Sequence, residues 1–151
     1  IIHRIGIYGG AMTQLDEIVD VFELLGEWDQ RYEYLIELGE KLPVMPDRLK
    51  TQDNKVKGCM SQVWISAYLQ GGQVKFTGDS DTSVIKGIFA LLVSLCDGLS
   101  APQVQALDMD TIFRGLKLDA HLSPSRHVGV YAIFDLMKQK AADAAATVDA
   151  A

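Results

Sequence analysis

Apolar residues recur at intervals of three and four over several stretches of the chain, which is the spacing of helices with one buried face. Capping residues precede these stretches, and glycine or proline comes after them. Helices are predicted at residues 15–25 with Thr13 as the N-cap, at 29–41, at about 83–99, from Ser100, at 110–116, and from Ser123 through Met137. The helix at 83–99 is mostly apolar, so we expect it to be buried.

The pattern changes between the second and third of these helices. Residues 63–69 are rich in β-branched and aromatic side chains, and in residues 74–77 apolar and polar positions alternate. Gly71-Gly72 separates the two runs, which is typical of a β-hairpin. Val56 would begin a third strand, and the polar stretch 43–57 is typical of a long exposed loop.

These elements predict one α+β domain, a small antiparallel sheet of about three strands with helices packed on one face. A chain of 151 residues can build one domain with a real core but not two ordinary ones. We expect the domain to span residues 12–140. Residues 1–11 share no period with the first predicted helix and are expected to be a mobile or non-native leader, and the alanine-rich tail at 141–151 is expected to fray.

The charge balance narrows the classes of partner. There are 20 acidic and 14 basic residues, for a net charge of −6. Bulk charge therefore argues against binding to nucleic acid or anionic lipid. The longest apolar run, residues 85–95, is interrupted by Lys86 and Gly87, and it is well short of the roughly 18–20 residues of a membrane-spanning helix. We expect no nucleic-acid partner and no membrane partner.

The chain has two cysteines, Cys59 and Cys96, which is too few for a disulfide framework. No secretory signal is visible, so we expect a cytoplasmic protein. With three histidines and no CxxC or HxxxH pair, we expect no metal, although a metal site assembled from distant residues stays open.

Cys59 is the strongest candidate for chemistry. It follows Gly58, which lets the backbone turn, at the end of the polar loop. From Asp47 to Gln62 four cations oppose two acids, and nearby cations favour the nucleophilic thiolate. The alternative is that Cys59 is a small buried hydrophobe at a strand start. Cys96 lies inside the apolar helix and is expected to be a core thiol.

Four separated segments resemble the SufE family of sulfur acceptors. The run Gly58-Cys59-Met60-Ser61-Gln62-Val63-Trp64 resembles the family's active-site segment, Gly-Cys-x-Ser-Gln-Val-Trp. The other three are similar to the family's second-helix, sheet-to-helix and late segments: Tyr34–Gly39 with Leu42-Pro43, Gly78–Asp81 with Val84–Gly87, and His121–Arg126. The resemblance runs from roughly Phe22 to Lys138, in the family's order and spacing.

The resemblance implies that Cys59 accepts sulfur as a persulfide from a cysteine desulfurase and passes it to an iron–sulfur scaffold complex or another sulfur acceptor, stimulating the desulfurase. Pyridoxal phosphate is expected on the partner desulfurase alone, and no cofactor on this chain. The family shares a fold with the U-type iron–sulfur scaffolds, which hold a cluster with three cysteines. This chain has one loop cysteine, so it should carry sulfur and not build the cluster. Turnover by the chain alone is not expected.

The resemblance also points to supporting residues. Gly58 would allow the turn of the active loop, and Ser61 and Gln62 would hydrogen-bond that loop or simply satisfy backbone groups at a strand start. Arg126 could stabilise the Cys59 thiolate or anchor the loop, and the alternative is an ordinary surface arginine. His121 could assist proton transfer, or be a packing residue.

Two other classes of function stay open. One is an independent thiol sulfurtransferase, such as a rhodanese-like enzyme. The other is a non-covalent regulatory partner of a desulfurase in which Cys59 is incidental.

Overall fold

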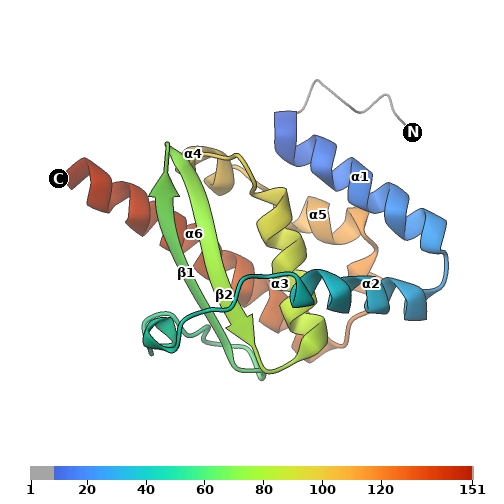
Figure 1. Ribbon diagram of the computed structural model, residues 1–151. Helices are drawn as coiled ribbons and strands as arrows, with labels where there is room; N and C mark the ends of the chain where they lie inside the picture. The colour runs from blue at the N-terminus through green and yellow to red at the C-terminus, as the bar shows by residue number, and fades with distance from the viewer. Residues whose placement is uncertain (1–8, 151) are drawn as a thin grey trace.

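The computed structural model describes residues 9–150, and this part of the chain forms six α-helices and one β-hairpin (Figure 1). The elements in chain order are α1 (Gly9–Leu25), α2 (Trp28–Glu40), the 3-10 turn η2 (Asp47–Leu49), β1 (Val63–Gln70), β2 (Gln73–Ser80), α3 (Ser83–Leu95), α4 (Ala101–Gln105), α5 (Met109–Gly115), the 3-10 turn η3 (Leu118–Ala120) and α6 (Pro124–Ala150). The predicted α+β class is confirmed.

The hairpin forms where the pattern predicts it. Its register pairs Val63 with Ser80 at one end and Gln70 with Gln73 at the other. The two-residue turn is Gly71-Gly72, with φ of 60° and 80°, and positive φ at both positions is what a tight hairpin turn with the twist of the strands requires.

The described sheet has two strands, so the prediction of about three was wrong by one. The segment around Val56 does lie antiparallel to β1, but only as an isolated bridge between Lys55 and Trp64. The pairing stops there because the chain turns away at Gly58, whose φ is +87°. Val56 therefore holds the loop to the sheet without extending the sheet.

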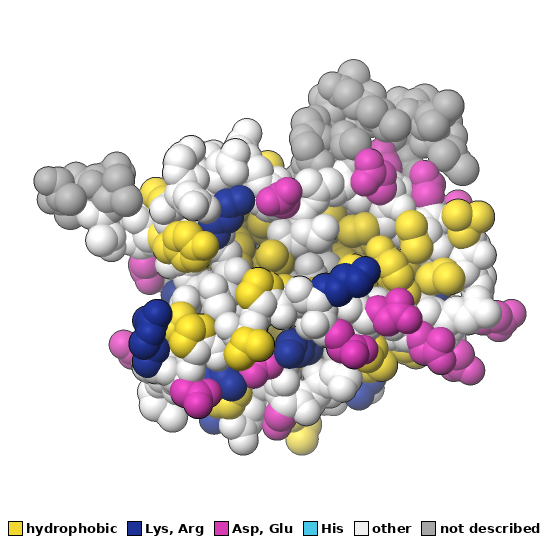
Figure 2. Space-filling model, in the orientation of Figure 1, with side chains coloured by type: hydrophobic (Ala, Val, Ile, Leu, Met, Phe, Trp, Pro, Cys, Tyr) yellow, Lys and Arg dark blue, Asp and Glu magenta, His cyan; other side chains and the backbone are white. Residues whose placement is uncertain are grey.

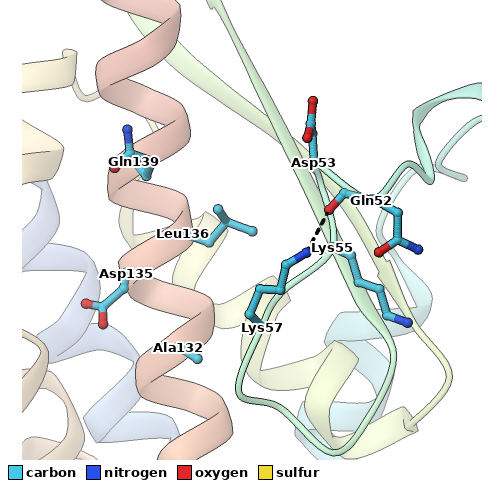
Figure 3. Close-up of a pocket in the computed structure, with 8 residues that line it drawn as sticks. All are labelled: Gln52, Asp53, Lys55, Lys57, Ala132, Asp135, Leu136 and Gln139. Carbon is cyan, nitrogen blue, oxygen red and sulfur yellow. Dashed lines mark hydrogen bonds between the residues drawn. The ribbon is translucent and has the colours of Figure 1, made fainter.

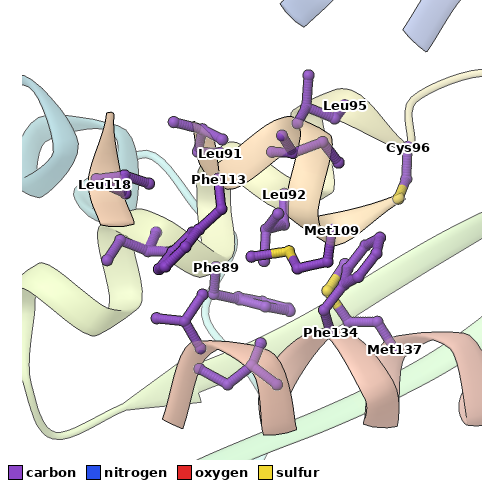
Figure 4. Packing of buried hydrophobic residues seen from close by; sticks show 14 of the residues in the cluster. Phe89, Leu91, Leu92, Leu95, Cys96, Met109, Phe113, Leu118, Phe134 and Met137 are labelled. Atoms are coloured by element: carbon purple, nitrogen blue, oxygen red, sulfur yellow. The ribbon is translucent and has the colours of Figure 1, made fainter. Parts of the chain in front are cut away.

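Helices cover one face of the hairpin. Figure 1 shows α6 crossing behind both strands, with α3 beside β2. Figure 4 shows the hydrophobic core, in which aromatic side chains of α3, α5 and α6 lie in one cluster with aliphatic ones. The largest of these side chains, Phe89, Phe113 and Phe134, are almost fully buried. Burial of this apolar surface is the main force that holds the layers together.

Helices α2 and α3 approach each other through two glycines. A Cβ atom added to Gly87 would lie 2.1 Å from the carbonyl oxygen of Leu35, and one added to Gly39 would lie 3.0 Å from the Gly87 nitrogen. The two helix backbones are thus in direct contact, which side chains at these positions would prevent.

Three helix ends differ from the prediction by several residues. Helix α3 ends at Leu95 and not near residue 99, so Cys96 is its C-cap and does not lie inside it. Helix α1 already begins at Gly9, so Thr13 lies inside it, and the rest of the expected leader, residues 1–8, lies outside the described residues. Helix α6 continues through the alanine-rich tail to Ala150. Alanine has the highest helix propensity, and Ala141 is buried, so the helix has reason to continue past residue 140.

Charge is unevenly spread over the surface. Figure 2 shows acidic side chains gathered over α2. Asp29, Glu33, Glu37 and Glu40 are all exposed there, at helical spacing.

None of the helices described, from α1 to α6, combines the length and the apolar character that a membrane-spanning segment needs.

Candidate functional site

Cys59 lies in a short loop closed by backbone pairing. The amide of Val56 donates to the carbonyl oxygen of Val63 at 2.8 Å, and the amide of Ile65 donates to the carbonyl oxygen of Asn54, also at 2.8 Å. Residues 57–62 therefore form a loop whose two ends are held together at the start of β1. We name residues 57–62 the cysteine loop.

The thiol of Cys59 faces helix α6. A Cβ atom added to Gly129 of α6 would lie 2.9 Å from Cys59 Sγ, and one added to Gly58 would lie 3.8 Å from the Ala132 Cβ atom. Cys59 is half-buried, whereas the next residue, Met60, is 90% exposed. The loop thus turns its sulfur inward and its methionine outward.

The far end of the cysteine loop is tied to the start of α3. The amide of Gln62 donates to Asp81 Oδ1 at 3.0 Å, and the amide of Asp81 donates to the carbonyl oxygen of Gln62 at 3.2 Å. The hydroxyl groups of Ser61 and Thr82 lie 2.7 Å apart. These few hydrogen bonds, together with the contacts on α6, hold the loop closed.

Asp79 fixes the polar segment before the loop. Its carboxylate lies 2.9 Å from Lys50 Nζ and 3.2 Å from Lys86 Nζ. Burial opposes the charged carboxylate, but hydrogen bonds from Lys50, the Ser80 amide and Lys86 outweigh it, so the pKa of Asp79 is lowered. Lys50, one of the four cations near Cys59 in sequence, therefore pairs with Asp79 and not with the thiol.

A groove of about 450 Å³ opens between the segment 52–57 and the outer face of α6 (Figure 3). It is lined on one side by Gln52, Asp53, Lys55 and Lys57, and on the other by Ala132, Asp135, Leu136 and Gln139. The Lys57 ammonium group reaches into this groove and donates to the carbonyl oxygen of Gln52 at 3.5 Å. The positive charge of Lys57 is thus directed at the groove.

The structure separates the predicted supporting residues into two groups. Gly58, Ser61 and Gln62 lie in the cysteine loop, where they make its turn and its ties to α3. The His121 ring instead stacks on Trp28, with ring centroids 3.9 Å apart, and its carbonyl oxygen accepts from the Tyr32 hydroxyl. These contacts belong to packing against α2, the alternative noted for this histidine.

Arg126 lies on the first turn of α6 and is exposed. Its amide donates to Ser123 Oγ at 3.4 Å, which is a helix-start contact. It precedes Gly129 by three residues, so it shares a face of the helix with the position that Cys59 contacts. A role for Arg126 at the thiol stays a prediction.

Two residues at this site were missed in the sequence. Gly129 was not singled out, although an isolated glycine inside a helical pattern often marks a close approach. Asp81 stands just before α3, where an aspartate is an ordinary helix-cap candidate, but its carboxylate accepts a hydrogen bond from the Gln62 amide of the cysteine loop. Among the described residues no group of three or more His, Cys, Asp or Glu could hold a metal ion.

Cys96 provides an internal reference for the reactivity of Cys59. It is 1% exposed at the end of α3, and burial raises the pKa of its thiol to about 12, against a small lowering by the Lys138 charge. A raised thiol pKa means a smaller thiolate fraction, and the thiolate is the reactive form.

We therefore expect iodoacetamide to modify Cys59 and to leave Cys96 unmodified in the folded protein from neutral to mildly alkaline pH. Peptide mapping by mass spectrometry would measure both sites in one sample. The control is the same reaction in guanidinium chloride, where both cysteines should react. Modification of Cys96 at the rate of Cys59 in the folded protein would contradict the burial described here.

The chain is similar to known proteins of one family. A family model described as "SufE: Fe-S metabolism associated domain" matches residues 16–141. An uncharacterized SufE-like protein of Rhizobium meliloti (strain 1021) is 38% identical over 134 residues, which cover 86% of this chain and 96% of that protein. Another, from Rhizobium etli, is 36% identical over 134 residues, covering 86% and 90%.

The fold has a counterpart among solved structures. The solution structure of a hypothetical protein from Thermus thermophilus matches with a TM-score of 0.73 and covers 88% of this chain and 96% of its own. At 21% identity this match shows similarity of fold alone. From the family model and the two relatives, the chain belongs to the SufE family, and its role lies in sulfur transfer for iron–sulfur metabolism.

Proposed function

We propose that this chain carries sulfur as a persulfide on Cys59, which it accepts from a cysteine desulfurase and delivers to iron–sulfur cluster assembly. The observation that supports this most directly is the placement of Cys59, half-buried in a closed loop with its sulfur turned toward Gly129 of α6. A core cysteine such as Cys96 has no such loop. In this proposal the desulfurase carries pyridoxal phosphate and this chain carries no cofactor.

The transfer is a thiol exchange in form. The Cys59 thiolate attacks the outer sulfur of a cysteine persulfide on the desulfurase. A sulfur–sulfur bond forms to Cys59, and the bond inside the donor persulfide breaks. The electron pair of that bond leaves with the donor cysteine as its thiolate, so no oxidant or reductant is consumed.

The closed loop suits the carrying state better than the transfer state. A persulfide is easily lost to small thiols, and contact with α6 restricts access to the Cys59 sulfur. For transfer, the sulfur has to turn away from α6 toward a donor. The hydrogen bonds that this motion would break are those at Ser61 and Gln62, and the backbone pairing of Val56 with Val63 can stay intact.

A regulatory role without sulfur transfer is the second candidate. Met60 and Val128 are exposed large hydrophobic residues, and they are neighbours in sequence of Cys59 and Gly129, which are in contact. Such a surface could bind a desulfurase whether or not the thiol reacts.

The experiment that tests the proposal is intact-mass spectrometry after incubation with a cysteine desulfurase, pyridoxal phosphate and cysteine. We expect the mass of one added sulfur atom, mapped to Cys59 and removed by reductant. The control omits cysteine. Absence of the adduct, with a desulfurase shown to be active on a known acceptor, would overturn the carrier proposal.

A further inference from the structure

Gly129 is distinguished from the other glycines by the atoms that lie against it. The three heavy atoms nearest to an added Cβ are all atoms of Cys59: Sγ at 2.9 Å, Cβ at 3.6 Å and Cα at 3.8 Å. The two carbon distances are ordinary contacts. Only the sulfur occupies space that a methyl group would need.

The backbone at Gly129 gives no reason for glycine. It lies within α6 and has no positive φ, unlike Gly26, Gly58, Gly71, Gly72 and Gly98. Inside a helix glycine is less favourable than alanine. The reason for glycine that the structure does show is the Cys59 sulfur.

A second contact lies about one helical turn further along α6. The position of a Cβ on Gly58 lies 3.8 Å from Ala132, which is three residues beyond Gly129 and on the same face of α6. Two successive loop residues therefore rest on two small residues of the helix. The sulfur is the deeper of the two contacts, because Gly129 is buried whereas Ala132 is half-buried.

We propose that Gly129 is a positioning residue for Cys59: the absence of its side chain leaves a notch in α6 that seats the sulfur, and this notch sets how far the sulfur is open to reagents. A methyl group at position 129 would displace Sγ but would leave the rest of Cys59 in ordinary contact. The sulfur can move by rotating about its own Cα–Cβ bond. It would then turn away from α6, toward solvent.

The role of Gly129 in sulfur transfer rests on the proposed function of Cys59. If Cys59 carries sulfur, displacing its Sγ from the notch would let the desulfurase transfer sulfur to Cys59 faster. The resulting persulfide would also be lost faster to small thiols.

The test is the replacement Gly129→Ala, read by the rate at which iodoacetamide modifies Cys59. We expect this rate to rise roughly tenfold, because access of the reagent to the sulfur controls it, while Cys96 stays unmodified. The matched control is Gly115→Ala, the last residue of α5, where an added Cβ meets only Leu15 Cδ2, at 4.0 Å. That variant should modify Cys59 at the wild-type rate.

A rescue experiment keeps the proposal testable if Gly129→Ala alone folds poorly. In a Cys59→Ala background the sulfur is gone, so the methyl group at 129 has room and its helix propensity should raise the Tm. A Tm lowered by Gly129→Ala equally in both backgrounds would overturn the proposal. So would a Cys59 modification rate within about twofold of wild type in the folded single variant. Neither readout involves the desulfurase, so each is independent of whether Cys59 carries sulfur.

Discussion

Replacing Cys59 with serine is expected to abolish sulfur acceptance and, with it, the stimulation of the desulfurase. A serine hydroxyl keeps the shape of the residue but is not a nucleophile toward persulfide sulfur. The cysteine loop has no other thiol, and the remaining Cys96 is buried with a pKa raised to about 12. Desulfurase turnover of cysteine, measured with and without the variant, gives the result directly.

The same variant separates the two candidate functions. A regulatory partner acts by binding, so it would keep its stimulation in Cys59→Ser. Cys96→Ser is the matched control, since it also removes one thiol, and it should stimulate like wild type. Binding of Cys59→Ser to the desulfurase should persist, because Met60 and Val128 are unchanged. Retained stimulation by Cys59→Ser would contradict the carrier mechanism.

Replacing Gly87 with alanine is expected to lower the free energy of unfolding by about 3 kcal/mol or more, at the upper end of over-packing costs. The added Cβ would lie 2.1 Å from the Leu35 carbonyl oxygen and 2.4 Å from its carbonyl carbon. These are backbone atoms of α2, so no side chain can rotate away, and the two helices have to separate. Urea denaturation measures the change.

Alanine substitutions at two other glycines should destabilise the protein less than Gly87→Ala. At Gly39 the nearest atom to an added Cβ is 3.0 Å away, so Gly39→Ala should destabilise less than Gly87→Ala. At Gly115 the nearest atom is 4.0 Å away, so alanine there should be tolerated. A Gly87→Ala variant as stable as Gly115→Ala would show that α2 and α3 do not pack as described.

The elements of the fold were predictable because their signals are local. The spacing of apolar residues marks α2 and α3, and Gly71-Gly72 between two β-prone runs marks the hairpin. The missing third strand has a local cause too, at Gly58. A turn at Gly58 prevents a third strand only if the chain does not pair with β1 again beyond it, and the residue pattern does not predict whether it does.

The neighbours of the candidate site were not predictable, because they are remote in sequence. Gly129 contacts a cysteine 70 positions earlier, and His121 stacks on Trp28, 93 positions earlier. A histidine in a loop looks the same in sequence whether it packs or transfers protons. Asp81 before a helix looks like a cap, and only the approach of Gln62 gives it another partner.

The pairing of Val56 with Val63 limits how far the thiol can travel. Cys59 is three residues from Val56, and three fully extended residues span about 10 Å. While this pair holds, Cys59 is on a tether of that length, fixed to the edge of the hairpin. A donor sulfur recessed more deeply than this in its own protein would be out of reach. For transfer from such a donor, either its cysteine would have to move outward to meet the loop, or the hydrogen bond from the Val56 amide to Val63 would have to break.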